Sequence, residues 1–406
     1  AEYMGNLYNS VHCSTVKGLT RMERNRRRGF NNPQRRPWHR ENSHELDRSS
    51  HSKPRTATSV IHIQGETGTE LTSIPAVIGT CPLMCPENER MQRERLRDLA
   101  VFERQMGDPS KTTSKLAVKK FCRTISTKET DPSSIRPLAV LEETLKYLLH
   151  LMDSTDHPFE ALHDFISDRT RSIRQDLSMQ NIVNDKAVAI LEKVVEFHVL
   201  SMHKLQRNAK SLDLSSLHLN MEQLTKSLAT LYTLYDGNRS ISSNPNEPEF
   251  RSLHLLLRLN TESQPMGAPL SILLRSTPNS VIHSKELNFA RKALKFFSLG
   301  YFKQFLNVVS SDASYLQLGV LGSAILEVRV KWLCCVNNVG YKLHPYEVKH
   351  LAKLMMMKEE DMEDLCGSCG LTVKADEFGG KLLEIKQDSF VFPKGLRQRK
   401  FSDLVK

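Results

Sequence analysis

The chain is 406 residues long, with 39% hydrophobic residues, 25% charged residues and a net charge of +11 at pH 7. At roughly 150 residues per domain, this length predicts two or three domains or one extended helical array. No window approaches the roughly 18 apolar residues of a membrane span, and the N-terminus lacks the apolar core of a secretory signal. We therefore expect no membrane partner and no secretion. The eight cysteines are scattered, which argues against a secreted disulfide framework and predicts reduced thiols.

Most of the excess positive charge lies in residues 1–55, within a predicted N-terminal tail that spans residues 1–75. Residues 1–55 contain 12 Lys or Arg against 5 Asp or Glu, and aliphatic residues are scarce. Such a segment buries too little apolar surface to offset the entropy of ordering, so we predict a disordered basic tail. Arginine forks fit phosphate, which favours nuclear import or RNA contact over a merely solvated tail. The arginines proposed to do this are Arg26, Arg27, Arg28, Arg35 and Arg36.

A leading segment follows over residues 76–134. It opens with Cys81-Pro82-Leu83-Met84-Cys85-Pro86, in which each proline lacks an amide donor and favours extended backbone before it. Glu87 to Met106 then predicts a charge-rich helix that packs along one edge.

The next region, residues 135–322, has the periodicity of successive amphipathic helices. Apolar residues recur at three- and four-residue spacing from Ile135 to Tyr235, and again in stretches from Glu249 to Asn338. Period-2 alternation is missing over this length. The pattern predicts a mainly α fold, an α-helical repeat or irregular α-solenoid.

One helix of this region mixes polar residues into its apolar face. At 100° per residue, Arg169, Asp176 and Gln180 fall in or beside the sector that holds Ile166 and Ile173. Buried polar groups must be hydrogen-bonded, so we predict that Arg169 and Asp176 join a buried polar network. Alternatively, the helix ends near Ser178 and these residues meet water. Two further arginines, Arg171 and Arg174, point away from this sector.

The C-terminal quarter changes character and predicts a winged helix over residues 323–395, followed by a basic tail, 396–406. Helices are expected at 344–357 and 358–369, a strand at 371–375, and a hairpin that pairs 381–386 with 389–392. The second helix carries five carboxylates, which suits the positive end of its dipole and opposes DNA phosphates. We therefore place nucleic-acid contacts on the wing and on Lys394, Arg397, Arg399 and Lys400.

Catalytic and metal-binding patterns are weak. The sequence has no phosphate-binding P-loop, no nucleophile elbow and no H-E-x-x-H pair, and its helical histidines lack a partner at a diagnostic spacing. Cys81 and Cys85 lie about 280 residues from Cys366 and Cys369, far from the tight pairing of structural zinc sites. We therefore predict no enzyme activity, no metal and no cofactor.

Three motifs together resemble one family. CPLMCP at 81–86, RTRSIRQDLSMQ at 169–180 and ILEKVVEFHVLSMHKL at 190–205 are similar to the SAC/GANP family of mRNA-export scaffolds. Glu249-Phe250-Arg251 and the stretch Gly300 to Leu306 resemble two further family motifs. The likeness runs from about Gly79 to Phe392, and the short length resembles a compact plant member of the family.

The resemblance implies a PCI-type fold, in which helical repeats are capped by a winged helix. It also implies a scaffold of a nuclear transcription-and-export complex at the nuclear pore basket, which binds mRNA jointly with its partners. Those partners would be a second PCI-domain protein and a small acidic subunit shared with the proteasome lid. Centrin is a further implied partner, through a long C-terminal segment that has no counterpart before residue 406.

Two other functions stay open at this point. Some compact members of the family are structural proteins of the centrosome or spindle, so the same resemblance allows that role. A PCI subunit of the proteasome lid or of a translation-initiation assembly is the third reading, and the segment Arg169 to Gln180 argues against it.

Overall fold

The computed structural model describes residues 77–124, 131–154, 157–208, 214–240, 243–259, 270–341, 343–375 and 379–393. All of them belong to one unit, Pro75–Lys406. The basic tail predicted at 1–75, including its five proposed arginines, lies outside the described residues. So do Lys394, Arg397, Arg399, Lys400 and the basic tail 396–406.

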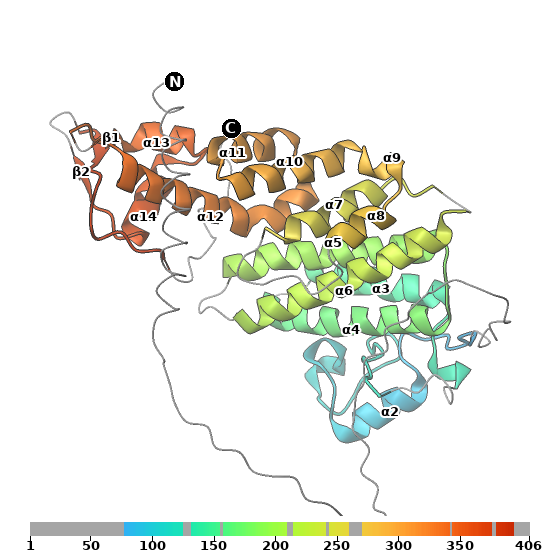
Figure 1. Ribbon diagram of the computed structural model, residues 1–406. Coiled ribbons are helices and arrows are strands. Elements are labelled where there is room, and N and C mark those ends of the chain that lie inside the picture. Colours follow the sequence, from blue (N-terminus) through green and yellow to red (C-terminus); the bar gives the residue numbers. More distant parts are fainter. Residues whose placement is uncertain are drawn as a thin grey trace, which may run out of the picture. The chain divides into compact units, whose positions relative to one another are not determined.

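The predicted mainly α fold is confirmed (Figure 1). The helices before residue 260 are α2 (Glu87–Leu96), α3 (Leu138–Ser154), α4 (Phe159–Met179), α5 (Asp185–Asn208), α6 (Leu214–Asn238) and α7 (Glu247–Leu257). Those after it are α8 (Leu270–Ser276), α9 (Asn279–Ile282), α10 (Lys285–Leu299), α11 (Phe302–Asp312), α12 (Tyr315–Val339), α13 (Val348–Leu354) and α14 (Glu359–Ser368). Single 3₁₀ turns lie at Val101–Glu103, Gln105–Gly107 and Pro132–Ser134.

The charged helix of the leading segment is shorter than predicted. It ends at Leu96 instead of Met106, because Arg97 adopts a left-handed conformation with φ 55°. The residues beyond it turn inward as 3₁₀ helix, which buries Leu99 and Glu103. The apolar residue Leu96, at the end of the helix, is 64% exposed.

Helices α3 to α7 pack side by side through the apolar faces that the periodicity identified (Figure 1). The closest pairing is between α5 and α6, whose facing rows are fully buried. These rows comprise Leu191, Val194, Val195 and Met202 on α5, and Leu224, Leu228, Leu231 and Leu234 on α6. The array continues through α10, which packs on α7 and α11, and through α12, which packs on α5, α7 and α11.

Helix α12 passes without a break through residues 322 and 323, where the sequence places the start of the winged helix. Its N-terminus is fixed by a capping box, in which Ser314 Oγ accepts from the Gln317 amide and Gln317 Oε1 accepts from the Ser314 amide. Gly319 lies so close to α5 that a Cβ atom would come within 2.5 Å of Val199.

The C-terminal part is a winged helix of α13, α14 and a three-stranded antiparallel sheet. Its strands β1 (Tyr346–Glu347), β2 (Val373–Ala375) and β3 (Lys381–Leu383) are ordered β1-β3-β2. The predicted hairpin was therefore wrong in its partner, since β3 pairs with β2 on one side and with β1 on the other.

The reason for this difference is the turn after β3. Lys386 takes a left-handed conformation, and its amide donates to the carbonyl of Asn337 at 2.8 Å, which directs the chain away from β3. Residues 389–392 instead run beside the end of α14, where the Val391 amide donates to the Cys369 carbonyl. The approach is close enough that a Cβ atom on Gly370 would come within 2.4 Å of the Ser389 carbonyl oxygen.

Candidate functional site

The most distinctive polar feature of the molecule is a pair of buried charge clusters that fix the leading segment to α4. One is centred on Glu103, which is fully buried. Its carboxylate pairs with Arg93 of α2 and lies 2.9 Å from an NH2 nitrogen of Arg169 on α4. It also accepts from the Val118 amide. The carboxylate thus holds α2 and residue 118 against α4.

The second cluster is centred on Asp176, also fully buried. Its two oxygens lie 2.6 Å from Lys119 Nζ and 2.7 Å from Arg136 Nε. Arg136 in turn donates to Ser172 Oγ and to the carbonyl of Met84. Each cation therefore meets the carboxylate and additional acceptors, which is the condition under which buried ion pairs are tolerated.

These contacts confirm that Arg169 and Asp176 join a buried polar network. Gln180 completes it, because Oε1 accepts from the Gly79 amide at 3.0 Å and Nε2 donates to the Arg136 carbonyl at 2.8 Å. The alternative, in which these residues meet water, is wrong.

The two arginines that point away from the apolar sector have separate partners. Arg171 lies over the ring of Phe121 in the leading segment, 3.9 Å from its centroid. Arg174 donates to Ser227 and Gln223 on α6. Burial lowers the pKa of Arg174 to about 10, with the Arg171 charge adding to the effect. Helix α4 is therefore bonded on one side to the leading segment and on the other to α6.

The cysteine–proline motif lies at the same junction. Cys81 and Cys85 are buried, as is Pro86, while Pro82 is exposed. The Cys81 amide donates to the Ile135 carbonyl, and burial raises the pKa of the Cys85 thiol to about 12. Both thiols are therefore protonated packing groups at neutral pH. Within the described ranges, no three His, Cys, Asp or Glu side chains gather as a metal would require.

Sequence reasoning missed the partners of these clusters: Arg93, Glu103, Lys119, Arg136 and Ser172. A signal was present in Arg136, a lone cation between Ile135 and Pro137 at the start of an apolar helix. Glu103 gave no such signal, because it lies in a charge-rich stretch whose pattern is typical of a solvent-exposed helix.

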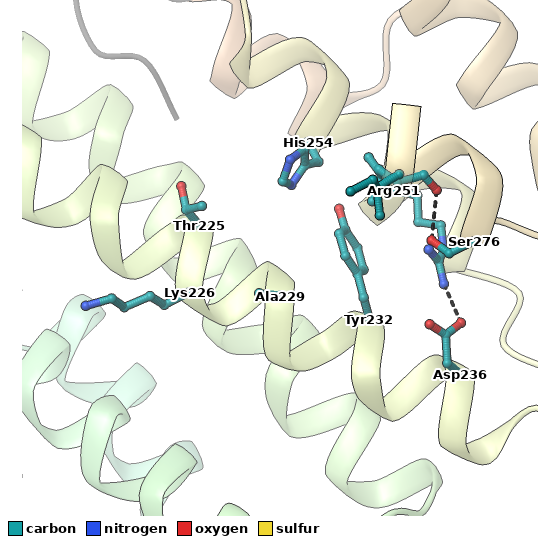
Figure 2. Close-up of a pocket in the computed structure, with 10 residues that line it drawn as sticks. Thr225, Lys226, Ala229, Tyr232, Asp236, Arg251, His254 and Ser276 are labelled. Carbon is teal, nitrogen blue, oxygen red and sulfur yellow. Dashed lines mark hydrogen bonds and ion pairs between the residues drawn. The ribbon is translucent and has the colours of Figure 1, made fainter. Parts of the chain in front are cut away.

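A hollow of about 290 Å³ lies between α6, α7 and α8 (Figure 2). Its polar groups mostly bond to one another, since Arg251 pairs with Asp236 at 2.7 Å and with Glu247 at 2.7 Å. The Tyr232 hydroxyl donates to the Phe250 carbonyl. These groups therefore join α6 to α7, and they do not form a nucleophile with an adjacent base.

His254 is the exception in this hollow. Its side chain is 5% exposed, and neither ring nitrogen has a hydrogen-bond partner. Burial lowers the pKa of His254 to about 4, with the charge of Arg258 adding to the effect. The imidazole is therefore neutral at pH 7 and too weak a base to take a proton there.

This lowered pKa predicts a pH-dependent stability. Between pH 6.5 and about 4 the unfolded chain binds a proton on this ring that the folded chain does not, so stability falls as the pH falls through that window. At pH 5 this costs the wild type about 1–2 kcal/mol relative to pH 7. His254→Leu should recover that difference in urea unfolding measured at both pH values. The exposed His283→Leu is the control, and an equal pH dependence in wild type and His254→Leu would contradict the assignment.

The second helix of the winged helix, α14, is acidic at its N-terminus. Glu359, Glu360 and Asp361 occupy its first turn, and Glu363 pairs with Lys381 of β3. The carboxylates that oppose a DNA groove have structural roles in this helix. Those of the first turn lie at the positive end of the helix dipole, and Glu363 binds the wing through Lys381. The buried face contributes Met362 and Leu365 to the core.

Among the described residues, no helix is long and apolar enough to cross a bilayer. The fold and its charge clusters define a helical array with a winged-helix end, held together by buried ion pairs. The SAC3/GANP family model matches residues 84–375, and the chain belongs to that family.

Three relatives show how far the likeness extends. The chain is 34% identical to SAC3 family protein B of Arabidopsis thaliana over 337 residues, 81% of this chain and 19% of that protein. It is 40% identical to SAC3 family protein 1 of Schizosaccharomyces pombe over 185 residues, 45% of this chain and 18% of the relative. Protein xmas of Drosophila melanogaster is 30% identical over 268 residues, 63% of this chain and 12% of the relative. The chain thus spans less than a fifth of each relative, and its likeness to a compact plant member stays a prediction.

Proposed function

We propose that this protein is a non-enzymatic scaffold subunit of a nuclear complex that couples transcription to mRNA export at the nuclear pore. The observation that carries the proposal is the match of the SAC3/GANP family to residues 84–375, which spans the helical array and most of the winged helix. In this role the chain binds mRNA together with a second PCI-domain protein and a small acidic subunit.

The arrangement of polar groups supports a scaffold more than an enzyme. The buried charges Glu103, Asp176 and Arg251 each pair with an oppositely charged side chain from another segment, so they serve to fix the array. In the hollow of Figure 2, the imidazole of His254 is neutral, and it makes no hydrogen bond to the hydroxyls of Thr225 and Ser276 that also line the hollow.

Affinity purification of the tagged full chain, followed by mass spectrometry, tests the proposal. We expect enrichment of a PCI-domain protein and a small acidic protein over a tag-only control, with the tagged chain at the nuclear rim. Recovery of spindle or centrosome proteins, with the tag at spindle poles, would instead support the structural role considered above. Turnover of a substrate by the purified chain alone would contradict the scaffold.

A further inference from the structure

The region around α10 carries a marked excess of positive charge. From Leu270 to Asn307 the chain has six Lys or Arg and a single carboxylate, Glu286. All six cations are exposed: Arg275, Lys285, Arg291, Lys292, Lys295 and Lys303. The one carboxylate lies 3.8 Å from Lys285 and is largely covered. None of the other five cations has a carboxylate of the described residues within 4 Å.

The centre of this charge is one face of α10. The helix has 15 residues and is about 22 Å long. Leu287, Phe289, Ala290 and Ala293 form its buried side, and the helix packs on α7 and α11. On the opposite side, Arg291, Lys292 and Lys295 fall within a sector of about 100° at 100° per residue. We call these three residues the α10 stripe.

The cations of the α10 stripe are exposed and have no carboxylate partner among the described residues. Several exposed lysines of other elements do have carboxylate partners, as in Lys120–Asp98, Lys226–Glu222, Lys331–Glu327, Lys374–Glu384 and Lys381–Glu363. In the part of the chain that the structure describes, no carboxylate lies within 4 Å of a stripe cation. Like charges three and four residues apart repel each other, so an external polyanion would relieve a cost built into the helix.

An aromatic ring lies at the C-terminal end of α10. Gly300 caps the helix in a left-handed conformation with φ 71°, and the next residue, Tyr301, starts the turn into α11. The Tyr301 side chain is 39% exposed, and its ring lies 6.3 Å from that of Phe296, centroid to centroid. Phe296 supports one side of the Tyr301 ring, so the exposed part of the Tyr301 ring is held in a position where a base can stack on it.

We infer that the α10 stripe, with Tyr301 and Lys303, binds a segment of single-stranded RNA along α10. Unpaired cations attract phosphates, and an exposed aromatic ring stacks on a base whatever its sequence. The choice of RNA as the polyanion rests on the proposed function. An acidic protein segment would satisfy the cations equally well, but it has no base to stack on the ring.

The test uses the full chain and a fluorescent, unstructured oligouridylate of about 15 nucleotides. Fluorescence anisotropy gives the Kd over a range of salt concentrations. The variant Arg291→Gln/Lys292→Gln/Lys295→Gln should flatten the plot of log affinity against log salt by about 2, since each phosphate contact contributes about 0.7 on single strands. At about 0.1 M salt, the same loss raises the Kd on the order of 100-fold.

Two further variants separate charge from stacking. Lys146→Gln/Lys186→Gln/Lys193→Gln changes the net charge equally on exposed positions of α3 and α5, and it should leave the slope nearly unchanged. Tyr301→Ala should weaken binding about tenfold without changing the slope, because it removes stacking and no charge. All variants are repeated in a chain whose Arg26, Arg27, Arg28, Arg35 and Arg36 are replaced by Gln, so that the tail does not dominate.

Several results would overturn the inference. One is a triple stripe variant with the wild-type slope, and another is a wild-type chain that does not bind the oligouridylate. A third is competition by polyglutamate as strong as by RNA, combined with no effect of Tyr301→Ala, which would assign the surface to an acidic protein segment. None of these results touches co-purification or localisation, so the proposed function is judged separately.

Discussion

Asp176→Asn should lower the free energy of unfolding by about 3–5 kcal/mol. The carboxylate is fully buried between Lys119 and Arg136, whose side chains are 4% and 0% exposed. The substitution keeps the size of the side chain and removes its charge, so two cations stay buried without a counter-charge. Chemical denaturation followed by circular dichroism measures the effect. A loss of this size is a large fraction of the 5–15 kcal/mol typical of a folded domain.

The matched control is Asp164→Asn on the same helix. Its side chain is 70% exposed and, among the described residues, contacts the His163 ring, so the change should cost less than about 0.5 kcal/mol. Equal unfolding midpoints for Asp176→Asn and Asp164→Asn would show that the buried cluster does not hold the leading segment. If Asp176→Asn does not accumulate as folded protein at 25 °C, the two variants can be compared at a lower temperature. Asp176→Asn is expected to be the less stable of the two there as well.

Arg329→Ala should lower the free energy of unfolding by about 3 kcal/mol and loosen the winged helix first. Arg329 is a fully buried residue of α12. It donates from Nε to the Met355 carbonyl at 3.0 Å and from an NH2 nitrogen to the Met356 carbonyl at 2.6 Å. These carbonyls follow α13, so the side chain ties the end of that helix to α12. Its removal leaves them unpaired beside a cavity.

Amide hydrogen exchange measures where the structure loosens. In Arg329→Ala, protection should fall between residues 343 and 375 more than in α3 to α6. Lys331→Ala, two residues away on the same helix and 45% exposed, is the control and should change neither region. Uniform loss of protection across the whole chain would contradict a local tie.

The helices of the array were predictable because their apolar residues recur at a period that only a helix places on one face. Leu224, Leu228 and Leu231 on α6, each 0% exposed, are an example. The buried position of Arg169 and Asp176 followed from the same geometry, since polar residues in an apolar sector need polar partners. The helix predicted at 358–369 is observed as α14, with acidic residues in its first turn.

The helical periodicity could not identify the residues that pair with these buried charges. Glu103 and Asp176 are 73 positions apart in the sequence, and the two cations beside Asp176, Lys119 and Arg136, come from segments outside the periodic helices. Lys119 stands next to Lys120 in a basic stretch, so its pattern is typical of a solvent-exposed residue until the fold places it beside a carboxylate. The hairpin error has a similar origin, because the turn at Lys386 depends on Asn337, which lies about 50 residues earlier.

The unbroken course of α12 has a mechanical consequence. Its 25 residues, about 37 Å of continuous helix, take part both in the array and in the terminal winged helix. A displacement of the winged helix by a bound molecule would therefore be transmitted along α12 into the helical array, because the helix is continuous between them. A proline substituted midway along α12 would break the helix into two flexibly joined halves. The two ends could then respond to their ligands separately.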